Sequence, residues 1–178
     1  MKLTKKLLAM ALAGVMLLTI LTGCSGGKTG DRLVEEYMAA HYHSSDVYKG
    51  IPITTNDVPE IKTFAEKFDP VWLNVNGSWN TRGGNNSDDE RCKALQKVFS
   101  KYSNSNGYTV VLYACKVDSK QSELSQAMRV MSPIYSGLAI YSFVGDPSIT
   151  AIQCATRLVT RGDESYRIAV VIYDHTAN

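Results

Sequence analysis

The sequence predicts an α+β protein in which a mixed sheet of about five strands carries helices mainly on one face. Two observations lead to this fold class. Through the middle of the chain, runs of β-branched residues alternate with segments of helical apolar spacing, a βαβαβ order that favours parallel strands. The last third instead holds three strand-like runs joined by short turns, as in an antiparallel meander.

Four segments have the apolar spacing of helices. Each is preceded by a side-chain oxygen that can accept from the free N–H groups of a first helical turn, and Glu60 and Glu90 add a reciprocal acceptor in two of them. The predicted starts are Asp31, Asp57, Ser87, and either Asp118 or Ser119. The apolar positions expected to face the core are Leu33, Val34, Tyr37, Met38 and His41; Ile61, Phe64, Ala65 and Phe68; Cys92, Leu95, Val98, Phe99 and Tyr102; and Leu124, Ala127, Met128 and Met131.

Five segments are predicted to be strands, and residues 50–56 between the first two helices to be a linker. The run 108–117 is almost continuously apolar or β-branched, which is typical of a central strand. Residues 148–160 would also suit a helix, but their β-branched residues favour a strand. The predicted strands are 71–75, 108–117, 137–144, 151–160 and 166–174.

The N-terminus has the pattern of an export signal. Three lysines lie within the first six residues, and residues 7–22 contain no charge. An apolar stretch of 16 residues is typical of a secretory signal and somewhat short for a membrane-spanning helix. An uncleaved membrane helix is the alternative, in which Cys24 would have no special role.

The end of this stretch, Leu21-Thr22-Gly23-Cys24, resembles the lipobox of bacterial lipoproteins. The resemblance covers residues 1–24 only. It implies that the Cys24 thiol receives a diacylglycerol and that cleavage before Cys24 makes it the new N-terminus. Two acyl chains would give durable anchoring to a membrane. The resulting division is a signal peptide at 1–23, a lipidated cysteine and flexible tether at 24–30, and one globular domain at 31–178.

Composition argues against several classes of function. Removal of the signal takes Lys+Arg from 19 to 16 against 17 acids, and no basic run remains, so nucleic acid is not an expected partner. The spacing of the later cysteines matches no zinc or CxxC pattern. His41 and His43 would point to opposite sides of a helix and so would not share an ion. We therefore expect no metal and no cofactor.

The three remaining cysteines allow several interpretations. Cys92 lies in a predicted first helical turn, where the helix dipole would activate a thiol, and His175 could serve as its base. The alternative is that Cys92 belongs to the buried stripe beside Leu95, which leaves no catalytic residue to assign. Cys115 and Cys154, both in predicted strands, are either reduced core residues or a disulfide.

The loop 76–87 is the predicted binding site. It is about twice the usual connection length, and its Trp79 and Arg82, with Trp72 just before it, could contact a sugar or a partner protein. We expect Trp79 to be at least partly exposed there. The alternative is that Trp79 folds back onto the core.

These observations predict a binding or accessory module of the cell envelope, held on the extracytoplasmic face of the cell membrane by diacylglyceryl-Cys24. Its partner would be an envelope protein or a glycan. Two other functions fit the same sequence: an extracytoplasmic hydrolase of Cys/His type, and an immunity or exclusion lipoprotein that blocks a partner at the membrane.

Overall fold

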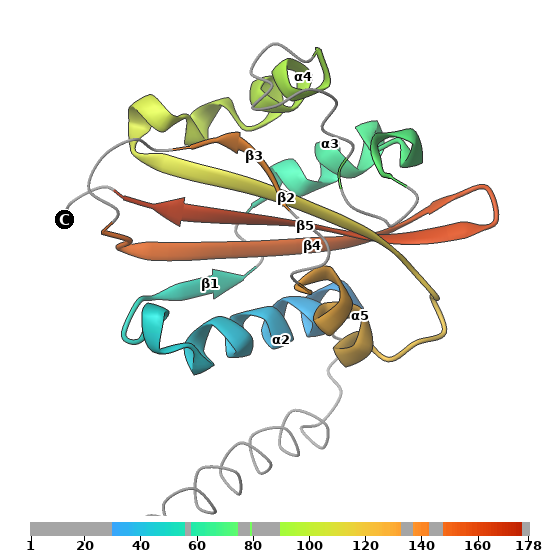
Figure 1. Ribbon diagram of the computed structural model, residues 1–178, viewed down its shortest axis with the longest axis horizontal. Coiled ribbons are helices and arrows are strands. Elements are labelled where there is room, and N and C mark those ends of the chain that lie inside the picture. Colours follow the sequence, from blue (N-terminus) through green and yellow to red (C-terminus); the bar gives the residue numbers. More distant parts are fainter. Residues whose placement is uncertain are drawn as a thin grey trace, which may run out of the picture.

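The computed structural model describes residues 30–55, 58–74, 79, 90–132, 137–142 and 148–175. Cys24 and Arg82 lie outside these residues. Within the described residues, short 3-10 turns, among them η1 (Asp46–Tyr48) and η2 (Pro70–Trp72), join longer elements. These are α2 (Gly30–Ser44), β1 (Ile53–Thr55), α3 (Glu60–Lys67), α4 (Glu90–Val98), β2 (Tyr108–Val117), α5 (Glu123–Val130), β3 (Leu138–Tyr141), β4 (Ala151–Arg161) and β5 (Glu164–Asp174) (Figure 1).

The strands form one mixed five-stranded sheet in the order β1-β4-β5-β2-β3, which confirms the predicted fold class. Only β1 and β4 pair in parallel; β4 with β5, β5 with β2, and β2 with β3 are antiparallel. The central strand is β5, which is paired along its whole length on both sides. Residues 148–160, which also suited a helix, contain the strand β4.

Helices cover both faces of this sheet, so the expectation that they lie mainly on one face is wrong. Helices α3 and α4 pack on one face and α2 and α5 on the other, as Figure 1 shows. The reason lies in β5, where Ile168, Val170 and Ile172 point to the first face and Ala169 and Val171 to the second, all fully buried. A strand that is apolar on both sides needs a cover on both sides.

The strand assignment was wrong at two places. The predicted strand 71–75 begins as the 3-10 turn η2, and its one described bridge joins Leu73 to Trp79. The missing strand is β1, in the segment predicted to be a linker. It is three residues long, and such a short edge strand carries too little alternation to be recognised.

The strand pairing that the sequence order predicted also differs from the observed pairing. Strand β3 pairs with β2 and not with β4, so the last three strands are a hairpin plus a separate edge strand, and the βαβαβ region contains no parallel pair of its own. Among the described residues the parallel pair is instead β1 with β4, which are far apart in sequence. Sequence order alone does not contain this information.

The predicted helices α2, α3 and α4 are present, with the apolar positions of α3 buried as expected. In α5 the buried residues are Gln126, Ala127 and Val130, whereas Leu124 and Met128 are exposed. The expected apolar stripe of α5 is therefore wrong for those two residues. No helix in the described part of the chain is sufficiently long and apolar to cross a membrane.

Candidate functional site

Trp79 is buried, which contradicts the expectation that it is exposed for binding. Only 6% of its surface is accessible, and its indole Nε1 donates a 2.8 Å hydrogen bond to the backbone oxygen of Leu112 in β2. Its ring stacks with Phe64 at a centroid distance of 6.2 Å and with Trp72 at 6.2 Å. Trp79 thus belongs to the core between α3 and the sheet.

Trp72 is half-buried against the same cluster. The predicted group of Trp72, Trp79 and Arg82 therefore includes one core residue, one partly covered residue, and Arg82 outside the described residues. A contact of Arg82 with a partner stays a prediction.

Cys92 and the histidines lie on opposite sides of the sheet. The Cys92 thiol is buried in the hydrophobic cluster between the sheet and the helices α3 and α4. His41 and His43 are on α2, which covers the other face, and His175 lies within 3.1 Å of Thr109 Oγ1 and 3.3 Å of the Ser148 oxygen. Val110 of β2 belongs to the same buried cluster as Cys92. Successive side chains of a strand point to opposite faces, so the side chain of Thr109 points away from this Cys92 cluster. This arrangement does not support a Cys92–histidine pair.

Cys115 and Cys154 are buried free thiols, and burial raises the pKa of each to about 12. Cys115 is paired with Arg167 of β5, and Cys154 with Val171. These positions on β5 are four residues apart, or about 13 Å along the strand. A disulfide needs Cα atoms within about 7 Å, so the register excludes this pairing and favours two reduced core residues.

The described residues contain no group of three or more His, Cys, Asp or Glu side chains that could hold a metal ion.

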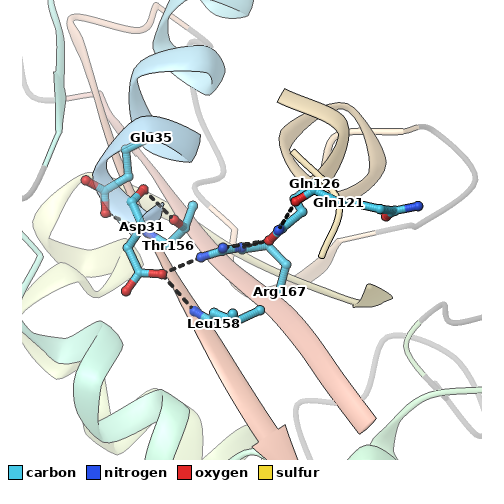
Figure 2. Close-up of polar contacts among 7 residues, drawn as sticks. All are labelled: Asp31, Glu35, Gln121, Gln126, Thr156, Leu158 and Arg167. Carbon is cyan, nitrogen blue, oxygen red and sulfur yellow. Dashed lines mark hydrogen bonds and ion pairs between the residues drawn. The ribbon is translucent and has the colours of Figure 1, made fainter. Parts of the chain in front are cut away.

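A buried charge cluster links α2 and α5 to the sheet (Figure 2). Arg167 of β5 is 1% exposed; its Nη1 donates to Asp31 Oδ1, and its Nε and Nη2 donate to Gln126 Oε1 at 3.1 and 2.6 Å. Gln126 in turn donates through Nε2 to the backbone oxygen of Gln121 at 2.9 Å. No buried side-chain nitrogen or oxygen of Asp31, Gln126 or Arg167 lacks a hydrogen-bond partner, so we interpret this cluster as structural.

The same cluster closes the open edge of β4. Strand β1 pairs only with 152–154 of β4, so the next outward N–H groups need other acceptors. Glu35 Oε1 accepts from the Thr156 N–H at 2.9 Å, and Asp31 Oδ1 accepts from the Leu158 N–H at 2.9 Å. Asp31 was expected to cap its helix; its carboxylate instead acts as a sheet-edge acceptor. Such contacts keep an exposed edge from pairing with another chain.

A cavity of about 280 Å³ on the α2–α5 face is a candidate ligand site. Its floor is the buried Met38, Val130 and Val171, and its rim includes His41 and Ser45. Met131 and four tyrosines complete the lining; the tyrosines are Tyr42, Tyr48, Tyr113 and Tyr173.

Tyrosine hydroxyl groups make the lining of the cavity polar. Tyr42 and Tyr173 share a 3.0 Å hydrogen bond between their hydroxyl groups, and burial raises the pKa of both, as it raises the pKa of Tyr113. These phenols are therefore neutral at physiological pH and can both donate and accept. The rings of Tyr48 and Tyr173 lie 6.3 Å apart, and each is edge-on to Tyr42. The cavity thus combines aromatic surface with hydroxyl groups.

Sequence reasoning missed both the cavity and the buried cluster. The four tyrosines come from α2, η1, β2 and β5, and no spacing connects them; a total of ten tyrosines was the single hint. Arg167 had a clearer signal, because it lies between Tyr166 and the apolar run Ile168 to Ile172, where a charge needs a buried partner.

Comparison with known proteins found no matching family model, no similar curated protein and no similar solved structure. The function is therefore inferred from the sequence, the fold and the tyrosine-lined cavity.

Proposed function

We propose that this chain is a lipid-anchored binding module of the cell envelope and that it binds its ligand in the tyrosine-lined cavity. Anchoring rests on the sequence Leu21-Thr22-Gly23-Cys24, which resembles a lipobox. Binding rests on the cavity, which replaces the loop around Trp79 as the candidate site. The protein would act on the extracytoplasmic face of the membrane.

The chemistry of the cavity favours a neutral, ring-shaped ligand that carries hydroxyl or amide groups. No Asp, Glu, Lys or Arg is among its described lining residues, and His41 at the rim is the one lining side chain that can carry a charge. A ligand group that enters among the tyrosines would therefore lose its hydration without gaining a charged partner, which favours a neutral group there. Its volume is at the lower end of the range for ligand sites, which suits one ring. Aromatic faces beside hydroxyl groups fit the apolar and polar sides of a sugar, and we therefore propose an envelope glycan.

The binding proposal can be tested with N-acetylglucosamine oligosaccharides, which contain the uncharged sugar of peptidoglycan, titrated into the full-length protein in detergent and followed by calorimetry. Tyr113→Phe and Tyr173→Phe remove one hydroxyl each and are expected to weaken binding by about tenfold, the effect of one lost hydrogen bond of about 1.4 kcal/mol. Tyr141→Phe is the matched control, because Tyr141 is a half-buried tyrosine that packs against the Cys92 cluster on the opposite face.

Absence of heat with every glycan, or an equal loss in the Tyr141→Phe control, would contradict the cavity as the binding site. Anchoring is tested separately by metabolic labelling with a fatty acid. The wild-type chain should be labelled and the Cys24→Ala variant should not, because Cys24 supplies the thiol that is acylated. Equal labelling of both chains would refute the anchor.

A further inference from the structure

Helix α5 exposes two large apolar side chains that the fold leaves uncovered. Leu124 is 38% exposed and Met128 is 68% exposed. They are four residues apart, so they lie next to each other on the outer side of the helix, and together we call them the α5 ridge. The inner side of α5 is occupied by Gln126, Ala127 and Val130, which are buried.

The α5 ridge lies close to the point where the chain enters the domain. Helix α2 begins at Gly30, where a methyl group in place of the α-hydrogen would lie 3.4 Å from Glu123 Oε1, in the first turn of α5. Figure 1 shows the first turn of α2 beside α5, on the face of the sheet away from α3 and α4. The ridge begins one residue after Glu123.

The length of chain before Gly30 limits how far this surface can be from a lipid anchor. Six residue steps separate Cys24 from Gly30, and even a fully extended chain spans at most about 22 Å over that length. A short tether of this kind gives a surface near its attachment point an effective concentration in the millimolar range. A contact that would be negligible in solution is then well populated.

We infer that the α5 ridge rests in the headgroup region of the membrane to which Cys24 is anchored, and that it thereby fixes the orientation of the domain. This inference rests on the proposed lipid anchor. Leucine and methionine side chains supply apolar surface for the acyl boundary, as in helices that lie in a membrane interface. Lys120 and Arg129, both exposed, are on either side of the ridge in sequence and can reach lipid phosphates.

The test compares two labelled positions on the full-length lipidated protein in vesicles of equal parts phosphatidylethanolamine and phosphatidylglycerol. Met128→Cys places a fluorophore on the ridge. Val71→Cys is the matched control, because Val71 is 70% exposed and lies on η2, whose neighbours Trp72 and Leu73 pack on the opposite face. The native cysteines at 92, 115 and 154 are buried and should not react.

We expect a lipid-borne quencher to reduce emission from position 128 several-fold more than from position 71. Adding Leu124→Glu to the Met128→Cys chain should remove most of that difference, since a carboxylate would be driven out of the interface. Equal quenching at both positions would overturn the inference. Shielding of position 128 from aqueous iodide without lipid quenching would also overturn it, because a protein segment or a second copy would then cover the ridge.

Vesicle flotation separates this failure from failure of the anchor. If the wild-type chain floats with the vesicles, the anchor is present and the quenching result tests the ridge alone. Stronger quenching at position 128 than at position 71 then supports the inference, and equal quenching overturns it. If the wild-type chain floats no better than Cys24→Ala, the proposed anchor is wrong, and the inference about the ridge is overturned with it.

Discussion

The indole of Trp79 contributes in two ways to the face covered by α3 and α4. It fills space against Phe64 and Phe68, and its N–H satisfies the Leu112 oxygen inside the core. Trp79→Ala would remove both contributions. We expect it to lower the free energy of unfolding by about 3–5 kcal/mol, measured by urea denaturation.

Trp72→Ala provides the comparison for this prediction. Trp72 stacks on Trp79 but is only half-buried, so its loss should cost clearly less. Equal effects of the two substitutions would contradict the assignment of Trp79 to the core. A folded Trp79→Ala variant that kept wild-type stability would return Trp79 to the list of candidate binding residues.

Glu35 makes a second prediction at the scale of one residue. It is 3% exposed, and burial raises the pKa of its carboxyl above the ordinary value of 4.5, although the Thr156 N–H opposes that shift. The folded chain therefore holds this proton more tightly than the unfolded chain. The contribution of Glu35 to stability falls as the pH rises from about 4.5 through the raised native pKa, and is constant below that interval.

Glu35→Gln keeps an oxygen for the Thr156 N–H but cannot ionise. Its free energy of unfolding relative to wild type should increase as the pH is raised from about 5 to about 8, in denaturation curves recorded at several pH values. Parallel pH profiles for the two proteins would show that Glu35 does not carry this dependence. Glu35→Leu, which removes the acceptor, should be destabilising at every pH.

At the scale of elements, Arg167 connects β5 to both helices of its face. Its guanidinium donates to Asp31 of α2 and to Gln126 of α5, and Asp31 also accepts from the edge of β4. Arg167→Ala would remove the donor to Gln126 Oε1 and the positive charge beside the Asp31 carboxylate. We expect it to lower the free energy of unfolding by about 3–5 kcal/mol.

Arg161→Ala is a suitable control for Arg167→Ala. Arg161, on the adjacent strand β4, donates to backbone oxygens of Ala65 and Phe68 but is half-exposed, so water can replace it. The cost of Arg161→Ala should be much smaller in the same denaturation experiment. A cost for Arg167→Ala of less than about 1 kcal/mol would mean that the cluster is dispensable.

At the scale of the whole molecule, stability depends on the contact between the sheet and its two helical layers. Leu112 of β2 and Val170 of β5 are fully buried and are paired across the two strands. Truncation of either residue to alanine should cost about 2–4 kcal/mol, because buried surface is lost and a cavity remains. Thermal and urea unfolding both report this loss.

Leu124→Ala is the control, because it makes the same substitution as Leu112→Ala at a leucine on the exposed side of α5. Its effect on stability in solution should be below about 0.5 kcal/mol. Effects of that small size at Leu112 and Val170 would contradict the central position of β2 and β5. Conversely, a large effect at Leu124 would show that something covers the α5 ridge.

The sequence by itself determined the α+β class, the long strands and the main helices, because the local alternation of apolar residues is strong there. It also predicted an export signal and a lipidated Cys24 from residues 1–24, a prediction that concerns residues outside those the structure describes. For Cys92 it left a catalytic and a core role open, and for Cys115 and Cys154 a disulfide and two reduced residues. Burial and strand register decided for free thiols.

Only the tertiary structure decided which strands are neighbours, where the helices lie and where a ligand would fit. The parallel pair of β1 with β4 and the cover on both faces follow from long-range packing, which one local pattern cannot encode. Trp79 shows the same limit, since a polar loop sequence does not reveal that its indole reaches Leu112. The tyrosine cavity exists because four distant segments meet, and hydrophobic periodicity describes each segment without its partner.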